Sequence, residues 1–238
     1  MLLLRDIELN TVPPIGTETS LRRAWQIMRD EGVTTLCVEH ADGTFAGMVT
    51  LKDISAAVLD GQDTHVLANT RTLYGNVVSA LDGAIVSGDA DGRTVDGRIV
   101  VGAGSAEQME RAIHAGDVVV VSGRSEGQLT ALEADAGCLV VCTGVEVSKG
   151  ILRVAREKNC LIVSTPHNVY ATAQMLPQAV PVRCYMRSEG LLTFALDTPL
   201  DEAGRAIRTV QHRYFPVLDE CGRCAGMLSH RNLLSHMQ

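Results

Sequence analysis

The chain has 238 residues, enough for one large domain or two ordinary domains with hydrophobic cores. Its hydrophobic content of 46% excludes a disordered chain, and its formal net charge of −7 argues against general binding to nucleic acid. No apolar run approaches the roughly 20 residues of a membrane-spanning helix, and the three leucines before Arg5 are too few for a signal peptide. With seven scattered cysteines, these features predict a cytoplasmic protein with reduced thiols.

Residues 1–62 form the first predicted domain, with the element order β-α-β-β-α. Thr19 or Ser20 caps the first helix, and Gly32 ends it. The apolar stripe predicted for this helix consists of Leu21, Ala24, Trp25 and Met28. The predicted elements are an extended segment at 11–19, a helix at 21–31, a strand at 34–40, a return strand at 45–50 and a second helix at 51–59.

Residues 63–178 show a different rhythm, in which short runs rich in Val and Ile alternate with amphipathic helices. This alternation predicts a mostly parallel sheet covered by helices. Ser105 and Gln108 have the spacing of a capping box, so a helix is expected to begin there. Gly102 and the nearby glycines resemble a dinucleotide-binding loop, but Glu107 stands where the third glycine is needed, so a simple helix start is the better interpretation.

Residues 179–238 repeat the first domain at a constant offset of 179 residues. The segment GMVTLKD, which begins at Gly47, returns as GMLSHRN, which begins at Gly226. The second copy therefore has the same predicted order, and its first helix carries the apolar stripe Leu200, Ala203, Ile207 and Val210. A repeat on this scale indicates that the two ends of the chain are copies of one unit, with another domain inserted between them.

Each copy resembles a CBS domain, both in its element order and in the ending Gly-hydrophobic-hydrophobic-Thr/Ser-x-x-Asp. The first copy completes this ending with Asp53, whereas the second has Asn232 there. The middle resembles a DRTGG domain, although its nearest counterpart of the name-giving motif is the altered stretch at residues 91–97. The expected fold is therefore α/β and α+β, with two CBS units packed as a pair and an α/β DRTGG-like domain between them.

The order CBS–DRTGG–CBS resembles the regulatory region of CBS-containing family II inorganic pyrophosphatases. The resemblance implies binding of adenine nucleotides, with AMP and ADP as inhibitors and ATP or diadenosine polyphosphates as activators. It also implies a homodimer, and manganese or cobalt in catalytic domains. This chain has neither an Asp-His-His motif nor a convincing two-metal set, so we expect it to contain no catalytic residue and no cofactor. Nucleic acid and membranes are not expected partners.

Matched positions in the two copies supply the candidate nucleotide-binding residues. A hydroxyl at the start of a helix and a neighbouring cation suit phosphate, and a carboxylate one turn later suits ribose hydroxyls. Each charged residue taken alone could equally be a solvated helix residue, so the argument depends on the repeat. The candidates are Thr50, Lys52 and Asp53 in the first copy and Ser229, Arg231 and Asn232 in the second.

Arg213 and Tyr214 are two further candidates, because they precede the strand of the second copy. Arginine can hold a phosphate with two hydrogen bonds, and tyrosine can stack on a base or donate its hydroxyl. Tyr214 could instead be a partly buried core residue. His212 lies beside them and is the histidine expected near the site.

Three alternatives remain open at this stage. The pair Cys221 and Cys224 has Cys-x-x-Cys spacing, but without a second pair a turn is the better interpretation than a metal or redox site. The chain could also be a stand-alone ligand-sensing CBS protein with no link to pyrophosphate. A third reading, an enzyme whose middle domain performs catalysis, lacks a recognisable catalytic constellation.

Overall fold

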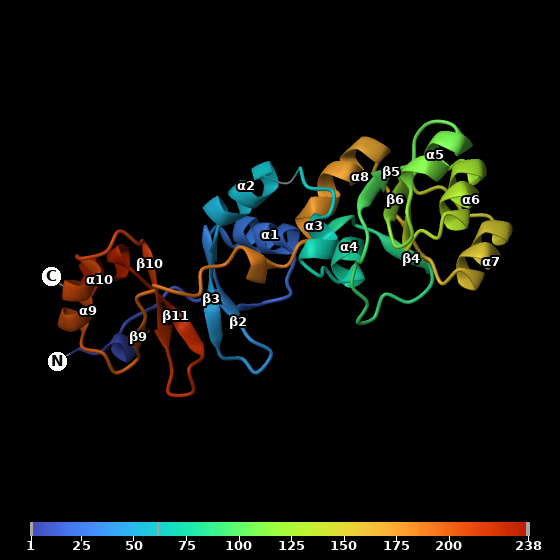
Figure 1. The fold of residues 1–238 in the computed structure, drawn as a ribbon. Coiled ribbons are helices and arrows are strands. Elements are labelled where there is room, and N and C mark those ends of the chain that lie inside the picture. The colour runs from blue at the N-terminus through green and yellow to red at the C-terminus, as the bar shows by residue number, and fades with distance from the viewer. Residues whose placement is uncertain (1, 61, 237–238) are drawn as a thin grey trace. The chain divides into compact units, whose positions relative to one another are not determined.

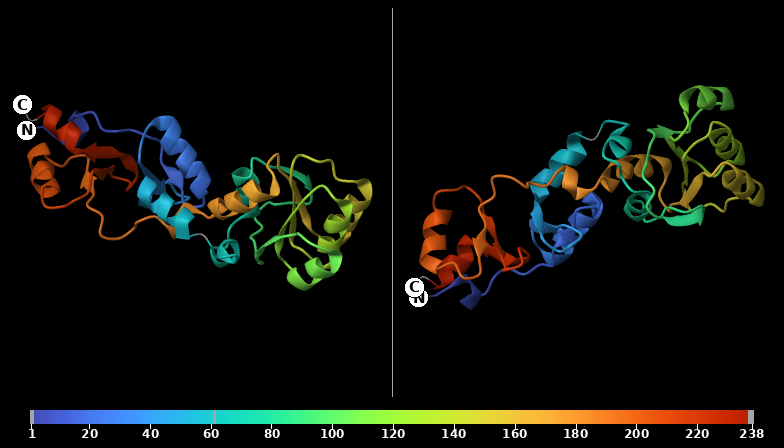
Figure 2. Two further views of the ribbon diagram at one scale, coloured as in Figure 1. Left: turned by 90° about the horizontal axis from the view of Figure 1, so that it is seen from above. Right: turned by 60° about the horizontal axis from the view of Figure 1, so that its bottom comes forward.

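The computed structural model describes residues 2–60 and 62–236, which fold into two compact units. One unit contains both copies of the repeat, through residues 2–19, 24–55 and 185–236. The other consists of the middle of the chain, residues 56–60 and 62–184, together with residues 20–23. Figures 1 and 2 show the ribbon, in which the blue and red ends of the chain form the first unit.

The first copy has the predicted β-α-β-β-α order. Its sheet has the order β1-β2-β3, in which β1 runs parallel to β2 and β3 runs antiparallel to it. Ser20 caps the first helix, since its Oγ accepts a hydrogen bond from the Arg23 amide at 3.1 Å. The elements are β1 (Ile15–Gly16), α1 (Leu21–Glu31), β2 (Thr35–Glu39), β3 (Phe45–Thr50) and α2 (Leu51–Asp60).

The second copy repeats this order and this sheet, with β9 parallel and β11 antiparallel to β10. Even the irregularity of the hairpin is repeated. The register shifts after Val38 in the first copy and after Val217 in the second, 179 residues later. The elements are β9 (Phe194–Ala195), α9 (Leu200–Ile207), β10 (Tyr214–Leu218), β11 (Cys224–Ser229) and α10 (His230–His236).

The N-terminal segment packs into the second copy rather than the first. Leu4, in the short helix η1 (Leu4–Asp6), and Ile7 are buried in one cluster with Phe194, Leu200 and Phe215. The backbone agrees, because the Leu4 amide donates to the Thr198 carbonyl at 3.0 Å. The core of the second copy is therefore completed by residues from the other end of the chain.

Gly47 and Gly226 have the same structural reason in both copies. Each lies where an extended segment crosses the return strand of its copy. Arg187 forms an antiparallel bridge with Met48, and Asn10 forms one with Met227. A Cβ atom on Gly47 would lie 2.3 Å from the Arg187 carbonyl oxygen, so only glycine fits beneath the crossing segment.

The middle domain has the expected, mostly parallel sheet. Its strand order is β4-β8-β7-β6-β5, in which only the edge strand β4 runs antiparallel to its neighbour. The strands are β4 (Ala84–Ser87), β5 (Ile99–Val101), β6 (Val118–Val121), β7 (Cys138–Val141) and β8 (Leu161–Ser164). The helices are α3 (Val66–Asn69), α4 (Tyr74–Ala80), α5 (Ala106–Ala112), α6 (Ser125–Glu133), α7 (Lys149–Glu157) and α8 (Val169–Met175), followed by the short helices η2 (Leu176–Ala179) and η3 (Val182–Cys184).

Helices α5, α6 and α7 cover one face of this sheet. Alternate strand residues such as Val119, Leu139 and Ile162 pack against Met109 of α5 and Ile151 of α7 in one buried cluster. The capping box predicted for α5 is present. The Ser105 amide donates to Gln108 Oε1 at 2.9 Å, and the Gln108 amide donates to Ser105 Oγ at 3.3 Å.

Two predicted stripe residues lie elsewhere than expected. Trp25 is 38% exposed, with the Arg29 guanidinium 5.0 Å from its ring centroid, so it belongs to the surface of α1. Val210 lies beyond the end of α9 and is only partly buried. The turn at Cys221 and Gly222 connects β10 with β11, as predicted. Within residues 2–60 and 62–236, no helix has both the length and the apolar composition for crossing a bilayer.

Candidate nucleotide site between the repeat copies

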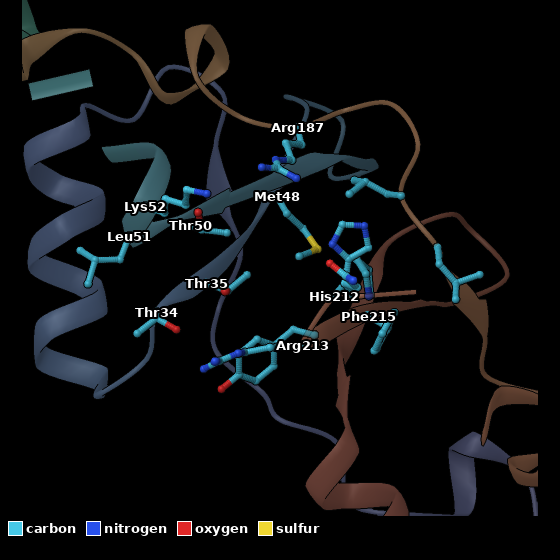
Figure 3. Close-up of a pocket in the computed structure, with 15 residues that line it drawn as sticks. Thr34, Thr35, Met48, Thr50, Leu51, Lys52, Arg187, His212, Arg213 and Phe215 are labelled. Atoms are coloured by element: carbon cyan, nitrogen blue, oxygen red, sulfur yellow. The ribbon is translucent and has the colours of Figure 1, made fainter. Parts of the chain in front are cut away.

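A cavity of about 390 Å³ lies within the unit that both repeat copies form. This volume is in the range of small-molecule sites. One wall comes from β2, β3 and the start of α2, and the opposite wall from the segment that enters β10 (Figure 3). The lining residues are Thr34, Thr35, Met48, Thr50, Leu51, Lys52, Arg187, Leu191, Leu192, Gln211, His212, Arg213, Tyr214, Phe215 and Pro216.

The lining combines cations with apolar surface. Lys52, Arg187 and Arg213 are its cations, and none of the described lining residues is acidic. They come from three separate segments that reach the same cavity (Figure 3). In a chain with a net charge of −7, this concentration of positive charge favours an anionic ligand. Met48, Leu51 and the other apolar side chains offer a surface for an uncharged ring.

The start of α2 is held by a reciprocal pair of hydrogen bonds. The Thr50 amide and the Thr50 hydroxyl donate to Asp53 Oδ2 at 2.9 and 2.7 Å. In return, the Asp53 amide donates to Thr50 Oγ1 at 3.2 Å. This is the capping arrangement that a Thr-x-x-Asp spacing favours. The hydroxyl proton of Thr50 is thus given to Asp53 and is not available to a phosphate in this conformation.

Asp53 keeps one carboxylate oxygen outside the cap. Its Oδ1 lies 4.0 Å from Nε of Arg187, a residue of the crossing segment. The Asp53 side chain is 14% exposed, and that of Arg187 is 54% exposed. Arg187 can therefore turn between this carboxylate and an anion in the cavity, because it lines the cavity and its backbone is anchored to Met48 at 2.9 and 2.8 Å.

The matching position in the second copy is already filled by the chain itself. Asn232 Oδ1 accepts from the Ser229 amide at 3.0 Å, from the Ser229 hydroxyl and from Asn10 Nδ2 at 2.9 Å. Asn232 Nδ2 donates to the Glu8 carbonyl at 3.0 Å. Both ends of this carboxamide are thus engaged, whereas Asp53 retains an oxygen near the cavity.

The structure gathers half of the predicted site residues around this cavity. Thr50, Lys52, Arg213 and Tyr214 line it, together with His212. Its lining does not include the other four, Asp53, Ser229, Arg231 and Asn232. Asp53 is nonetheless adjacent, through its bonds to Thr50 and its approach to Arg187.

Sequence reasoning missed Arg187, Thr34 and Thr35. The two threonines stand 179 residues before Arg213 and Tyr214, so the repeat itself could have pointed to them. Arg187 offered no such signal. Its structural counterpart is Asn10, only 177 residues earlier, so the constant offset of the repeat does not reach the crossing segments.

Sequence profiles of two families match this chain. The CBS domain matches at residues 4–60 and again at 182–238, and the DRTGG domain matches at 76–179. The chain is therefore a CBS–DRTGG–CBS protein, with two CBS domains that flank a DRTGG domain. In this organisation it is homologous to the regulatory region of the family II inorganic pyrophosphatases.

The most informative relative is the cobalt-dependent inorganic pyrophosphatase of Clostridium perfringens. It is 26% identical over 234 residues, which are 98% of this chain and 43% of the relative. A crystal structure of the CBS and DRTGG domains of the regulatory region of the C. perfringens pyrophosphatase, complexed with the activator diadenosine tetraphosphate, superposes with a TM-score of 0.89 and 26% identity. The match covers 97% of this chain and 100% of that one.

Two further relatives frame the comparison. A Thermotoga maritima protein named "Probable manganese-dependent inorganic pyrophosphatase" is 23% identical over 99% of this chain and 42% of its own length. The uncharacterized protein YtoI of Bacillus subtilis is 25% identical over 94% of this chain and 53% of its own length. The chain thus spans about half the length, or less, of the curated relatives that it matches.

The named pyrophosphatases depend on cobalt or manganese. Among residues 2–60 and 62–236, no group of three or more His, Cys, Asp or Glu side chains is arranged to hold a metal ion. The pair Cys221 and Cys224 belongs to no such group in this part of the chain.

Proposed function

We propose that this chain is the adenine-nucleotide-binding regulatory region of a family II inorganic pyrophosphatase, and that it tunes the hydrolysis of diphosphate to phosphate. The observation that carries the proposal is the cavity, in which Lys52, Arg187 and Arg213 face one another across an otherwise apolar and hydroxyl-rich lining. A nucleotide presents the complementary set, a polyanion joined through ribose to a flat ring. The whole-chain match to a regulatory region crystallised with diadenosine tetraphosphate supports this ligand class.

The proposal assigns separate tasks to the lining residues. Arg187 and Arg213 bind phosphate, and Lys52 adds charge at the start of α2. The free oxygen of Asp53 accepts from a ribose hydroxyl, and Tyr214 contacts the base. AMP and ADP inhibit, whereas ATP or diadenosine polyphosphates activate, and the parent protein is a manganese- or cobalt-dependent homodimer. A ligand produces such effects only by binding one arrangement of the CBS pair more tightly than another.

Calorimetry with AMP, ADP, ATP and diadenosine tetraphosphate tests the binding step. We expect saturable binding, and a ligand at 100 times its Kd should add about 2.7 kcal/mol to the stability of the chain. Arg213→Ala and Tyr214→Ala should each weaken binding, while Arg111→Ala, which removes an exposed arginine of α5, should not. Absence of binding by all four ligands at millimolar concentration would refute the proposal.

Similarity to YtoI favours a second candidate, a stand-alone ligand-sensing CBS protein. The flanking coding sequence distinguishes the two candidates. An Asp-His-His region in the same reading frame supports the pyrophosphatase, and the full-length protein should then hydrolyse diphosphate at a rate that nucleotides change.

A further inference from the structure

Two cysteines from different repeat copies meet beside the nucleotide cavity. Cys37 belongs to β2 of the first CBS domain and Cys224 to β11 of the second, 187 residues later. Their Sγ atoms share a hydrogen bond at 2.8 Å. Both are free thiols in this structure. We propose that Cys37 and Cys224 form a reversible disulfide, a redox modification site that joins the two CBS domains covalently.

The surrounding contacts hold the two thiols together. The turn before β11 is anchored to the first copy, because the Phe45 amide donates to the Gly222 carbonyl at 2.9 Å. Phe45 begins β3, which pairs with the strand that carries Cys37. A disulfide has a sulfur–sulfur separation of about 2.0 Å, so the two sulfurs need to approach by less than about 1 Å.

The two thiols differ in a way that suits stepwise exchange. Cys37 is 3% exposed, whereas Cys224 is only partly buried and can meet a small reagent. The hydrogen bond from Cys37 lowers the pKa of the Cys224 thiol, against the effect of burial. The same contact, followed by burial, raises the pKa of Cys37. Cys224 is therefore the attacking group, since the thiolate is the nucleophile.

The oxidant is a low-molecular-weight disulfide. The Cys224 thiolate attacks one of its sulfurs, which forms a mixed disulfide and releases one thiolate. Once Cys224 is capped, its hydrogen bond no longer holds the proton on Cys37. Cys37 then loses its proton to solvent and attacks Sγ of Cys224, and the second small thiolate leaves. Two protein thiols are oxidised by two electrons, and one small disulfide is reduced to two thiols.

The bond would act directly on the cavity walls. Cys37 is the register partner of Met48 and stands two residues from Thr35, and both of these residues line the cavity. A covalent link at this point fixes β2 relative to β11. It therefore holds one arrangement of the CBS pair, which is the arrangement in this structure with the cavity formed.

Other cysteines of the chain serve as internal references. In the middle domain, burial raises the pKa of the Cys160 thiol to about 12, and Cys138 is buried with its pKa raised as well. These two are expected to stay reduced. Cys221 is exposed and lies three residues from Cys224, so it is the nearest competing partner.

Treatment of the purified chain with oxidised glutathione tests the proposal, with peptide mapping by mass spectrometry before and after reduction. We expect a Cys37–Cys224 cross-linked peptide and a midpoint of thermal unfolding raised by roughly 5–15 °C, both reversed by dithiothreitol. Cys37→Ser and Cys224→Ser should each abolish them, whereas Cys221→Ser should not. A Cys221–Cys224 disulfide, or stable glutathione adducts without the cross-link, would overturn the proposal.

The disulfide does not depend on nucleotide binding, so its consequence is measured separately. The oxidised chain should bind diadenosine tetraphosphate at least about threefold more tightly than the reduced chain, because the cross-link keeps the CBS pair in the arrangement that contains the cavity. The Cys37→Ser variant should show no such difference. Equal affinities of the oxidised and reduced chains would overturn the regulatory consequence.

Discussion

Nε of Arg187 lies 4.0 Å from Oδ1 of Asp53, and this pair is the charged counterpart of a neutral pair in the other CBS domain. There, Asn10 Nδ2 donates to Asn232 Oδ1 at 2.9 Å. Arg187 and Asn10 bridge to residues 179 positions apart, as the repeat requires. Both partners of the pair thus differ between the copies, which leaves one copy with a movable cation and the other with a closed amide contact.

Replacement of Arg187 tests the movable cation. We expect Arg187→Ala to weaken diadenosine tetraphosphate about tenfold, because a charge-assisted hydrogen bond to phosphate is lost and about 1.4 kcal/mol corresponds to a factor of ten. Calorimetry at two salt concentrations measures the loss, and the wild type should show the steeper salt dependence. Arg111→Ala is the matched control. Equal affinities in the Arg187 variant and the wild type would place the phosphate elsewhere.

The closed amide contact predicts that Asn232→Asp is not a conservative change. Asn232 Nδ2 donates to the Glu8 carbonyl, so a carboxylate there would set oxygen against oxygen. We expect a loss of about 1–3 kcal/mol at pH 7, measured by urea unfolding, and a smaller loss at a pH low enough to protonate the new carboxyl. Asn159→Asp, at an exposed turn, serves as the control. A neutral effect of Asn232→Asp would mean that the Glu8 segment moves away freely.

The crossing segment makes Gly47 the least replaceable glycine of the first CBS domain. A Cβ atom there would lie 2.3 Å from the Arg187 carbonyl oxygen, so Gly47→Ala must displace the segment that carries the cation. We expect a destabilisation of roughly 1–3 kcal/mol and weaker nucleotide binding. Gly75→Ala, in α4 with nothing within 4 Å of the added atom, should instead stabilise by about 0.5–1 kcal/mol. Denaturant unfolding of both variants gives the comparison.

The DRTGG domain contains a buried carboxylate whose charge stabilises the fold. The Asp117 side chain is 2% exposed and accepts from the Arg98 amide, the Arg98 guanidinium and the His114 amide, each at 2.8 Å. Burial alone would raise the pKa of this carboxyl, but the hydrogen bonds from Arg98 and His114 lower it overall. Its stabilisation is therefore complete above the unfolded pKa of about 3.9 and is lost as the pH falls through the folded pKa.

We therefore expect Asp117→Asn to cost about 1–3 kcal/mol at pH 7, because an amide group would face three donors. Melting curves between pH 7 and pH 3 check the sign, since the difference between variant and wild type should shrink only below about pH 4. Asp91→Asn, at an exposed turn of the same domain, controls for charge. A difference that stays constant through the acid range would contradict the assigned charge of Asp117.

The repeat explains why so much of the fold was predictable. A constant offset between Gly47 and Gly226 defined both CBS domains, and the Ser105–Gln108 spacing located α5, because both signals are local in sequence. Trp25 was assigned to the core from helical spacing alone. The structure places it at the surface, where its ring packs against Arg29. Spacing identifies a face of a helix but not how far the neighbouring sheet extends over it.

The candidate site was predictable only in part, for a comparable reason. Lys52 and Arg213 lie next to regular elements, so their positions followed from the strands. Arg187 lies in an extended segment whose place is determined by a backbone bridge to Met48, a contact between distant parts of the chain. The engagement of Asn232 by Glu8 and Asn10 is of the same kind. No pattern of neighbouring residues encodes such contacts.

The crossing segments also order events during biosynthesis. The second CBS core waits for no later residue, because Leu4 and Ile7 are synthesised first. The first CBS domain, in contrast, emerges early from the ribosome and lacks the strand of Arg187 until more than a hundred further residues have followed. At about 5–20 residues per second, the nascent first domain spends several seconds with an open edge on β3. The DRTGG domain, whose sheet is formed from one continuous stretch, completes its strands within that interval.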